Sequence, residues 1–351
     1  MDDFHENCLI YKYTPIKLNK VRRIIAIGDI HGDMKVALKL LKIAKVIKIN
    51  DGNIEWIGSD THVVQTGDQL DSCRQGSNLC YKPGKKGDAN KSDIHVLTLF
   101  TELDIKAQEH GGRVISLLGN HEINNVINRM GSVSQDDVEY FGNIDERVRQ
   151  FQPGNKFSQL LGCTRLLFVM IGSNFFCHGG LIKPFIDKIR KTHEDPLDTL
   201  DRLNYVFRKW LITGNKDDEY AINLTAASGL SVEDACDYKL SILWNRILGN
   251  IKPDMANDSG HCNTTFLPIM DMIKMRNMII GHTPQIFLGN DSINGTCDKR
   301  LWRIDNALSD AFDELKDTIK TNKSKKKFQV LEIINDVLFN IITENDTLAT
   351  E

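Results

Sequence analysis

Three short stretches of the chain bring together the residue types that bind divalent cations. They read GDIHG at 28–32, GDQLD at 67–71 and GNHE at 119–122. In the first stretch, the Asp29 carboxylate and the His31 imidazole are two residues apart, so both could bind one cation. A single Asp-x-His is a weak signal, because polar turns after strands are common. The recurrence of such clusters makes metal chemistry the better interpretation.

Each cluster directly follows an apolar run, at 24–27, 61–66 or 113–118, that is typical of a buried strand. Two later expected strands also end in histidines. The residues at the five strand ends are Asp29 and His31, Asp68 and Asp71, Asn120 and His121, His178, and His282. Any one of these ends alone would be explained by a capped strand or a hydrogen-bonded core histidine. Open α/β sheets bind ligands at the carboxyl ends of their strands, and five such ends favour a binuclear metal site.

The motifs resemble those of a known family. GD-x-H-G, GD-x-x-D and GNHE, followed by H-G-G and G-H, resemble the calcineurin-like metallophosphoesterases and, within them, the phosphoprotein phosphatase branch. GNHEINN, CHGGL, LWNR, GHTPQ and LWRIDNALSDAF resemble its bacterial-type, Shewanella-like subgroup. The resemblance spans residues 22–312. It implies an α/β sandwich of two mixed β-sheets flanked by helices, with a largely helical insertion.

The resemblance also implies a role for each matching position. The metal ligands would be Asp29, His31, Asp68, Asn120, His178 and His282, with Asp68 bridging two divalent ions. A mixed oxygen and nitrogen ligand set suits Mn²⁺, iron or Zn²⁺, and we favour Mn²⁺. A water or hydroxide between the ions would attack phosphorus in line, without a phosphoenzyme intermediate. His121 would protonate the leaving oxygen while Asp71 orients its ring, and a supporting hydrogen bond is the alternative role for His121.

The chain departs from the family at one position. The family usually continues GD-x-x-D with Arg-Gly, whose arginine binds the substrate phosphate, but Asp71 is followed here by Ser72-Cys73-Arg74. A guanidinium suits phosphate oxygens better than an ammonium does. We expect Arg246, in LWNR, to bind the phosphate, with Arg74 as the second candidate. For both, a surface salt bridge is the alternative.

The spacing of apolar residues predicts the elements that position these side chains. Crossover helices are expected at 34–47 and 94–108, and a small hairpin around 54–57. A pair of strands is expected at 166–171 and 174–177, another strand at 278–280, and late strands at 301–305 and 329–342, the last turning at Asn335-Asp336. Helix is expected through most of 123–160 and of 185–250, and loop at 76–92 and 252–265.

These elements predict one catalytic domain with two flanking segments. The N-terminal lead would cover 1–21, and the catalytic domain 22–312, with helical insertions at about 123–160 and 185–265. A C-terminal extension at 313–351 would hold a lysine-rich loop and the final strands. The simplest interpretation of that loop is a solvated segment, with nuclear localisation or polyanion binding as alternatives.

Composition narrows the class of protein. The 351 residues carry a net charge of −3, which argues mildly against binding to long nucleic acid. There is no apolar run of the roughly 20 residues that a membrane span needs, and the acidic N-terminus does not resemble a secretory signal. The eight cysteines are scattered without a C-x-x-C pair. We therefore expect reduced thiols in a cytoplasmic protein, with the nucleus as the alternative location and no membrane partner.

The leading functional hypothesis is a metal-dependent phosphatase that hydrolyses phosphomonoesters of phosphorylated proteins or peptides. A hydrolase of dinucleoside polyphosphates or nucleotides on the same scaffold is the first alternative, since the metal ligands would be shared. A catalytically weak scaffold or binding protein is the alternative from another class. The missing Arg-Gly favours that last hypothesis, and the intact ligand set argues against it. The choice between phosphoserine or phosphothreonine and phosphotyrosine stays open, as does the oligomeric state.

Overall fold

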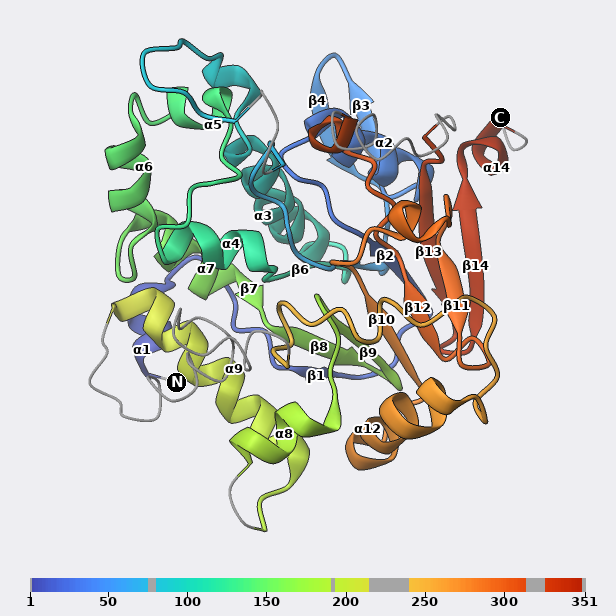
Figure 1. Ribbon diagram of the computed structural model, residues 1–351. Coiled ribbons are helices and arrows are strands. Elements are labelled where there is room, and N and C mark those ends of the chain that lie inside the picture. Colours follow the sequence, from blue (N-terminus) through green and yellow to red (C-terminus); the bar gives the residue numbers. More distant parts are fainter. Residues whose placement is uncertain (1, 75–79, 191–192, 215–239, 314–325, 349–351) are drawn as a thin grey trace.

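The computed structural model describes residues 2–74, 80–190, 193–214, 240–313 and 326–348. Two six-stranded β-sheets pack face to face, and helices cover the outer faces of both (Figure 1). This is the predicted sandwich of two mixed sheets flanked by helices. Within the described residues, no helix has both the length and the apolar composition needed to cross a membrane.

The first sheet carries the three N-terminal motifs. Its strand order is β14-β13-β2-β5-β6-β7. The bounds are β2 Arg23–Ile27, β5 His62–Gln65, β6 Arg113–Leu117, β7 Arg165–Leu166, β13 Gln329–Ile334 and β14 Leu338–Thr343. Strands β2, β5, β6 and β7 are parallel, whereas β13 runs antiparallel to β2. The three motifs therefore leave the sheet at one edge, as the sequence predicted.

The second sheet carries the two later histidines. Its order is β1-β8-β9-β10-β12-β11. The bounds are β1 Lys17–Leu18, β8 Phe168–Ile171, β9 Asn174–Cys177, β10 Asn277–Ile280, β11 Asn294–Thr296 and β12 Leu301–Arg303. Strands β9, β10 and β12 are parallel neighbours. His178 and His282 thus follow adjacent strands and come out on the same side.

Alternating side chains explain why the two sheets stack. In β2, Ile24 and Ala26 point into the layer between the sheets, while Ile25 and Ile27 face the outer helices. In β10, Ile279 belongs to the same inner layer. This period of two is what a strand buried on both faces requires.

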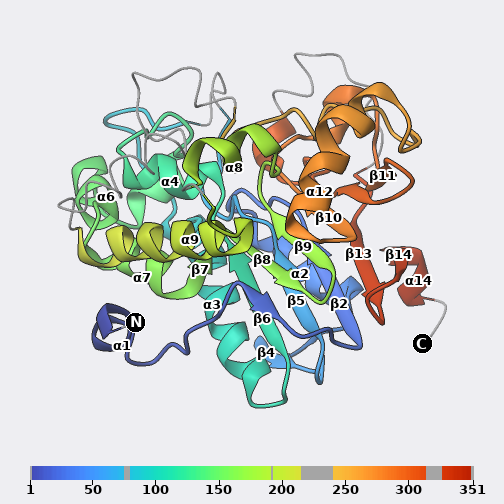
Figure 2. The ribbon, with the colours of Figure 1, turned by 90° about the horizontal axis from the view of Figure 1, so that it is seen from below.

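Helices close both outer faces of the sandwich. Two crossover helices, α2 Met34–Ile43 and α3 Ile94–Gln108, cover the first sheet. The second sheet packs against α7 Lys156–Thr164, α8 Lys183–Ile189, α9 Pro196–Thr213 and α12 Leu267–Ile273. Figure 2 shows α7 and α9 at one end of the molecule and the β13–β14 hairpin at the other.

The remaining elements are short. They are α1 Asp2–Asn7, α4 Asn120–Val126, α5 Gln135–Glu139, α6 Ile144–Phe151, α14 Glu344–Leu348, and the hairpin β3 Ile47–Asn50 with β4 Asn53–Trp56. Helical turns of other types cover Ala89–Lys91, Cys262–Phe266, Gln285–Leu288 and Asp310–Phe312.

Several boundaries differ from the sequence predictions. The helix expected at 34–47 ends at Ile43, because the chain turns there to begin β3. The strand expected at 166–171 is interrupted at Leu167, where the chain crosses from the first sheet to the second. Residues 240–250, expected to be helical, form successive turns that place Ser241, Trp244 and Asn245 in the interior. The rest of that predicted helix, 215–239, lies outside the described residues, as does the lysine-rich run up to Lys325.

The expectation of reduced thiols is wrong for six cysteines. Disulfides join Cys8 to Cys163, Cys73 to Cys80, and Cys262 to Cys297. The paired Cα atoms lie 5.3–5.5 Å apart, within the range that the bond requires. Cys177 is buried and unpaired, and Cys236 lies outside the described residues. Scattered spacing concealed these pairs because their partners meet only in the folded chain.

Candidate metal centre

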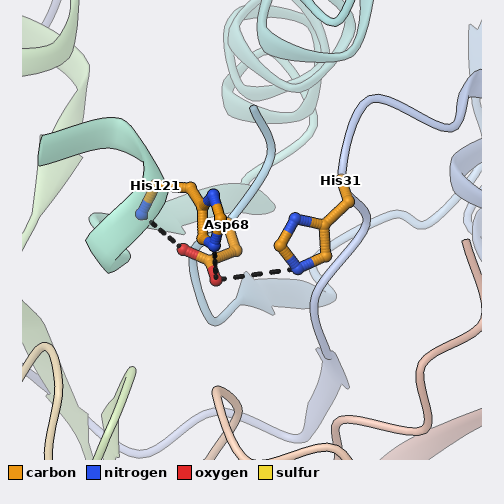
Figure 3. Close-up of side chains that lie close together, drawn as sticks. All are labelled: His31, Asp68 and His121. Carbon is orange, nitrogen blue, oxygen red and sulfur yellow. Dashed lines mark hydrogen bonds and ion pairs between the residues drawn. The ribbon is translucent and has the colours of Figure 1, made fainter. Parts of the chain in front are cut away.

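Asp68 lies at the centre of the predicted site residues. It follows β5 and is buried. Its Oδ2 lies 3.7 Å from Nε2 of His31 and 3.9 Å from Nε2 of His121, while its Oδ1 lies 3.3 Å from Nε2 of His178. In Figure 3 dashed lines join the carboxylate to His31 and to His121, which come from the loop after β2 and from the start of α4. One carboxylate thus contacts groups from three strand ends.

The described residues contain two clusters with the geometry of metal-ligand sets. One consists of His31, Asp68 and His121, and the other of Asp68, His178 and His282. Within each cluster the candidate ligand atoms lie within 4.8 Å of one another. Because Asp68 belongs to both, its carboxylate is within reach of the ligand atoms of both clusters.

Two further predicted ligands border these clusters. The side-chain oxygen of Asn120 lies 3.0 Å from Nε2 of His178. Asp29 belongs to neither cluster, and its two carboxylate oxygens accept hydrogen bonds from the backbone N–H of His282 at 3.2 and 3.0 Å. Asp29 nevertheless interacts electrostatically with Asp68, so the structure brings all six predicted ligands into one buried region.

In each of three histidine rings, one nitrogen is within hydrogen-bond distance of an oxygen of the protein. The second nitrogen of each ring faces this buried region. Nδ1 of His178 lies 2.8 Å from the Thr66 carbonyl oxygen, and Nε2 of His282 lies 2.9 Å from that of Trp244. Nδ1 of His121 lies 2.7 Å from Oδ2 of Asp71. Such outer hydrogen bonds are the usual way in which proteins orient metal-binding imidazoles. Nδ1 of His282 is buried, and no residue that the structure describes hydrogen-bonds to it.

The histidine and carboxylate environments fit a pair of divalent cations. Both nitrogens of His178 face oxygen acceptors, so the ring must either carry two protons or give Nε2 to a cation. Three buried carboxylates, those of Asp29, Asp68 and Asp305, lie close enough to perturb one another. Buried charges of one sign require compensation, which divalent cations would supply.

The pKa shifts reflect the same crowding. Burial and the neighbouring charges of Asp305 and Asp68 raise the pKa of Asp29 well above its usual value. Burial also acts on Asp68, but the imidazoles of His178 and His121 outweigh it and hold its pKa well below the ordinary value. Burial and the nearby Arg246 guanidinium lower the pKa of His282.

Four of the predicted site residues adopt the left-handed backbone region. The φ angles are 47° for His31, 55° for Asp68, 68° for Asp71 and 64° for His282. Such values are uncommon outside glycine and concentrate at functional sites, where the surrounding structure holds them. The turns after the strands are therefore shaped to aim these side chains.

Close packing explains the glycines that precede the motif residues. A Cβ added to Gly119 would lie 2.2 Å from Oδ1 of Asp68, and one added to Gly281 would lie 2.3 Å from Oδ1 of Asp29. Both separations are far below van der Waals contact. These positions need glycine because a carboxylate of the site occupies the space.

His121 is held by a buried polar network. The Asp71 carboxylate that contacts its Nδ1 also accepts a 2.8 Å hydrogen bond from the Asn125 amide. The Asp71 backbone N–H donates to Asp93, whose two oxygens accept from the Arg147 guanidinium at 2.9 and 2.7 Å. The network fixes both the ring and the carboxylate beside it.

Both candidate arginines point into the site, and Ser72 does not. Nη1 of Arg74 lies 3.0 Å from Nε2 of His121 and 3.3 Å from Nε2 of His31. Nη1 of Arg246 donates to the carbonyl oxygen of His282. The Ser72 hydroxyl instead donates to Asp137 at 2.7 Å.

Two positioning carboxylates were missed in the sequence. Glu122 accepts hydrogen bonds from the backbone N–H groups of Gly119, Asp68, Gln69 and Leu70, at 2.7–3.1 Å. It thereby joins the turns after β5 and β6, and its place in GNHE was the available signal. Asp305 follows β12 at the same edge, and its buried Oδ2 has no hydrogen-bond partner within the described part of the chain. It was assigned to the strand itself, although a carboxylate after an apolar strand is the same signal as at Asp29.

Comparison with known proteins defines the class. A model of the calcineurin-like phosphoesterase family matches residues 22–241. The chain belongs to this family, which confirms the resemblance seen in the motifs. The family defines phosphoester hydrolysis as the class of chemistry and implies divalent metal ions.

Individual proteins of known sequence or structure are also similar to this chain. The chain is 35% identical over 266 residues to the uncharacterized protein R398 of Acanthamoeba polyphaga mimivirus, covering 70% of this chain and 98% of that protein. It is 25% identical over 335 residues to Shewanella-like protein phosphatase 2 of Arabidopsis thaliana, covering 84% and 73%. A cold-active protein tyrosine phosphatase structure superposes with a TM-score of 0.63 at 20% identity, covering 95% and 82% of the two chains. That structural likeness confirms the fold.

Proposed function

We propose that this chain is a metal-dependent phosphoprotein phosphatase that hydrolyses phosphomonoesters. The observation that carries the proposal is the pair of histidine and carboxylate clusters sharing Asp68, in one of which Asp71 holds the ring of His121. The names of the Arabidopsis relative and of a 26% identical Plasmodium berghei relative, Shewanella-like protein phosphatase 1, favour phosphoprotein as the substrate.

The ligand set would be Asp29, His31, Asp68, Asn120, His178 and His282. When bound, two divalent cations would supply Lewis acidity toward the phosphoryl oxygens and an activated water. Mn²⁺ is our first choice, with iron or Zn²⁺ as alternatives, because all three accept this ligand set.

The chain's own residues would do the rest. The Asp71 carboxylate orients His121 through Nδ1, so Nε2 faces the site and can carry the proton given to the leaving oxygen. Asp71 also stabilises the charged ring from which that proton would come. The Arg74 and Arg246 guanidinium groups would bind phosphate oxygens and neutralise the charge that develops on them.

The test is a hydrolysis screen on protein supplied with Mn²⁺. We expect release of phosphate from phosphopeptides and from p-nitrophenyl phosphate, and its loss on addition of EDTA. Replacing His121 by Asn should lower kcat by about 10²–10⁴-fold, the usual worth of a positioned acid, while elemental analysis shows unchanged metal content. Full activity in that variant would contradict the acid role.

The same screen addresses the other hypotheses. A higher kcat/KM on diadenosine tetraphosphate than on every phosphopeptide would favour the nucleotide hydrolase. Absence of turnover on all phosphoesters, in protein that binds metal, would favour the scaffold.

A further inference from the structure

A cavity of about 720 Å³ opens beside the candidate metal centre. His31, Gly32 and Ser72 form the wall that it shares with the metal centre, and Ser309 and Ala311 lie on its border. A volume of this size is within the range of small-molecule sites, and far exceeds what one phosphate needs. The cavity therefore has room for a part of the substrate other than the reacting group.

Lysines dominate the charge of this cavity. Five line it: Lys35, Lys82, Lys85, Lys86 and Lys91. Lys91 pairs with Asp88 at 3.5 Å. The other four amino groups have no carboxylate within ion-pair distance among the described residues. They are thus available to an incoming anion.

The carboxylates of the cavity are already engaged. Asp33 accepts from the backbone N–H groups of Val36 and Asp310. Asp136 accepts from the Asp88 N–H at 2.8 Å, and Asp310 pairs with Lys326. Their hydrogen bonds fix these three carboxylates in place, and the five lysines that share the lining with them leave the cavity with a net positive charge.

The lysine segment is docked on a rigid support. The Gln135 side chain accepts from the Lys82 N–H at 3.1 Å and donates to the Lys85 carbonyl oxygen at 2.7 Å. The Gly87 N–H donates to Glu139, and a Cβ on Gly87 would lie 2.4 Å from the Gln135 carbonyl oxygen. The backbone that presents Lys82, Lys85 and Lys86 is therefore fixed against α5.

We propose that this cavity binds a second phosphate carried by the same peptide as the phosphoresidue at the metal centre. A phosphate carries about −1.5 to −2 charges at neutral pH, so a cluster of unpaired lysines is a complementary partner. The shared wall at His31 places the second phosphate a short distance along the peptide. The enzyme would then prefer multiply phosphorylated segments. This inference rests on the proposed phosphoprotein phosphatase function.

Peptide kinetics test the second-phosphate site. One peptide series carries a single phosphoresidue and, one to four positions away, a non-hydrolysable phosphonate residue; its partner series has alanine there. At one or more spacings we expect the phosphonate to lower KM by about tenfold, the combined effect of several exposed ion pairs, with kcat nearly constant. Raising the salt concentration should reduce the difference, because exposed charges are screened.

Matched triple variants locate the effect. Replacing Lys82, Lys85 and Lys86 by Ala should abolish the KM difference between the two peptide series. Replacing Lys17, Lys48 and Lys252 by Ala removes the same charge outside the cavity and should preserve the difference.

Three results would overturn the inference. Equal KM values in wild type at all four spacings would do so, and so would a difference that survives in the Lys82, Lys85 and Lys86 variant. The third is a lower KM for adenosine tetraphosphate than for every phosphonate peptide, which would assign the cavity to a nucleotide instead. Failure of the proposed function is distinct from these, since it would appear as no turnover on either series.

Discussion

Nδ1 of His121 lies 2.7 Å from Oδ2 of Asp71, and the other Asp71 oxygen accepts a hydrogen bond from Asn125. In an Asp71→Asn variant, the Asn125 amide would hold the side-chain oxygen, so the new NH₂ group would face His121. That group would force Nδ1 to be an acceptor and would disfavour the doubly protonated ring, so a neutral imidazole, a much weaker acid, would face the leaving oxygen. We expect kcat to fall by about 10²–10⁴-fold with metal content unchanged.

A pH profile separates this positioning role from a structural one. The variant should retain its melting temperature while the dependence of its kcat on pH changes shape. An unchanged profile would show that Asp71 does not control the ring.

Asp68 is the residue whose loss should most reduce metal binding. It belongs to both candidate clusters, so Asp68→Asn weakens two sites at once. We expect about two ions per chain in wild type supplied with Mn²⁺, and fewer than one in the variant, by elemental analysis. Asp104→Asn is a control, because Asp104 pairs with Arg113 away from the site. Equal metal content in all three proteins would contradict the bridging role.

Both candidate arginines should contribute to phosphate binding, and lysine should not substitute for Arg74. Arg74 reaches both His31 and His121 with one Nη, whereas Arg246 is bound to the His282 carbonyl oxygen. Loss of either should lower kcat/KM on phosphopeptide at least about tenfold, because a charge-assisted hydrogen bond contributes about 1.5–3 kcal/mol. Arg74→Lys should restore little, since a lysine lacks the fork geometry.

Phosphate inhibition constants measured alongside kcat/KM would identify the phosphate-binding group. The exposed Arg22→Ala serves as a control. Wild-type kinetics in Arg74→Ala would leave Arg246 as the remaining candidate.

Asp137 predicts a pH dependence of stability. Burial and the nearby Asp93 raise the pKa of Asp137 to about 6, above the value of 3.8 expected when unfolded. Between these values the folded state binds more protons, so the free energy of unfolding falls as pH rises from about 4 to about 6. Relative to Asp137→Asn, wild type should lose about 2–3 kcal/mol across that window.

Urea denaturation of both proteins at pH 4 and pH 7 measures this difference. A constant difference would show that the Ser72, Asp93 and Ser134 donors to the Asp137 carboxylate keep it ionised throughout.

The C-terminal strands should be required for a folded protein. Leu331 and Ile333 of β13 belong to the layer between the sheets, and β13 pairs with β2 along four residues. Removing residues 327–351 would expose that layer and turn β2 into an edge strand. We expect the truncated chain to be insoluble or to lack a cooperative thermal transition. A stable, metal-binding truncated protein would support the sequence-predicted boundary at residue 312.

Local patterns predicted the strands and the turns that follow them. Ile24–Ile27 and Arg113–Leu118 are apolar runs that end at glycine, and such signals do not depend on the rest of the chain. Partners that meet only after folding were not predictable in this way. Arg147 binds Asp93 from a different helix, and Cys8 joins Cys163 across 155 positions. Their sequence neighbourhoods carry no mark of the partner.

The pairing of β13 with β2 also bears on the order of synthesis. Strand β2, which leads to Asp29 and His31, leaves the ribosome early, and its neighbour β13 follows about 300 residues later. At about 5–20 residues per second, that interval is about 15–60 s. His282 is also made late, so the metal ligands cannot assemble while most of the chain is being made. During that time one edge of β2 has no partner, and its unpaired backbone groups are open to pairing with another chain.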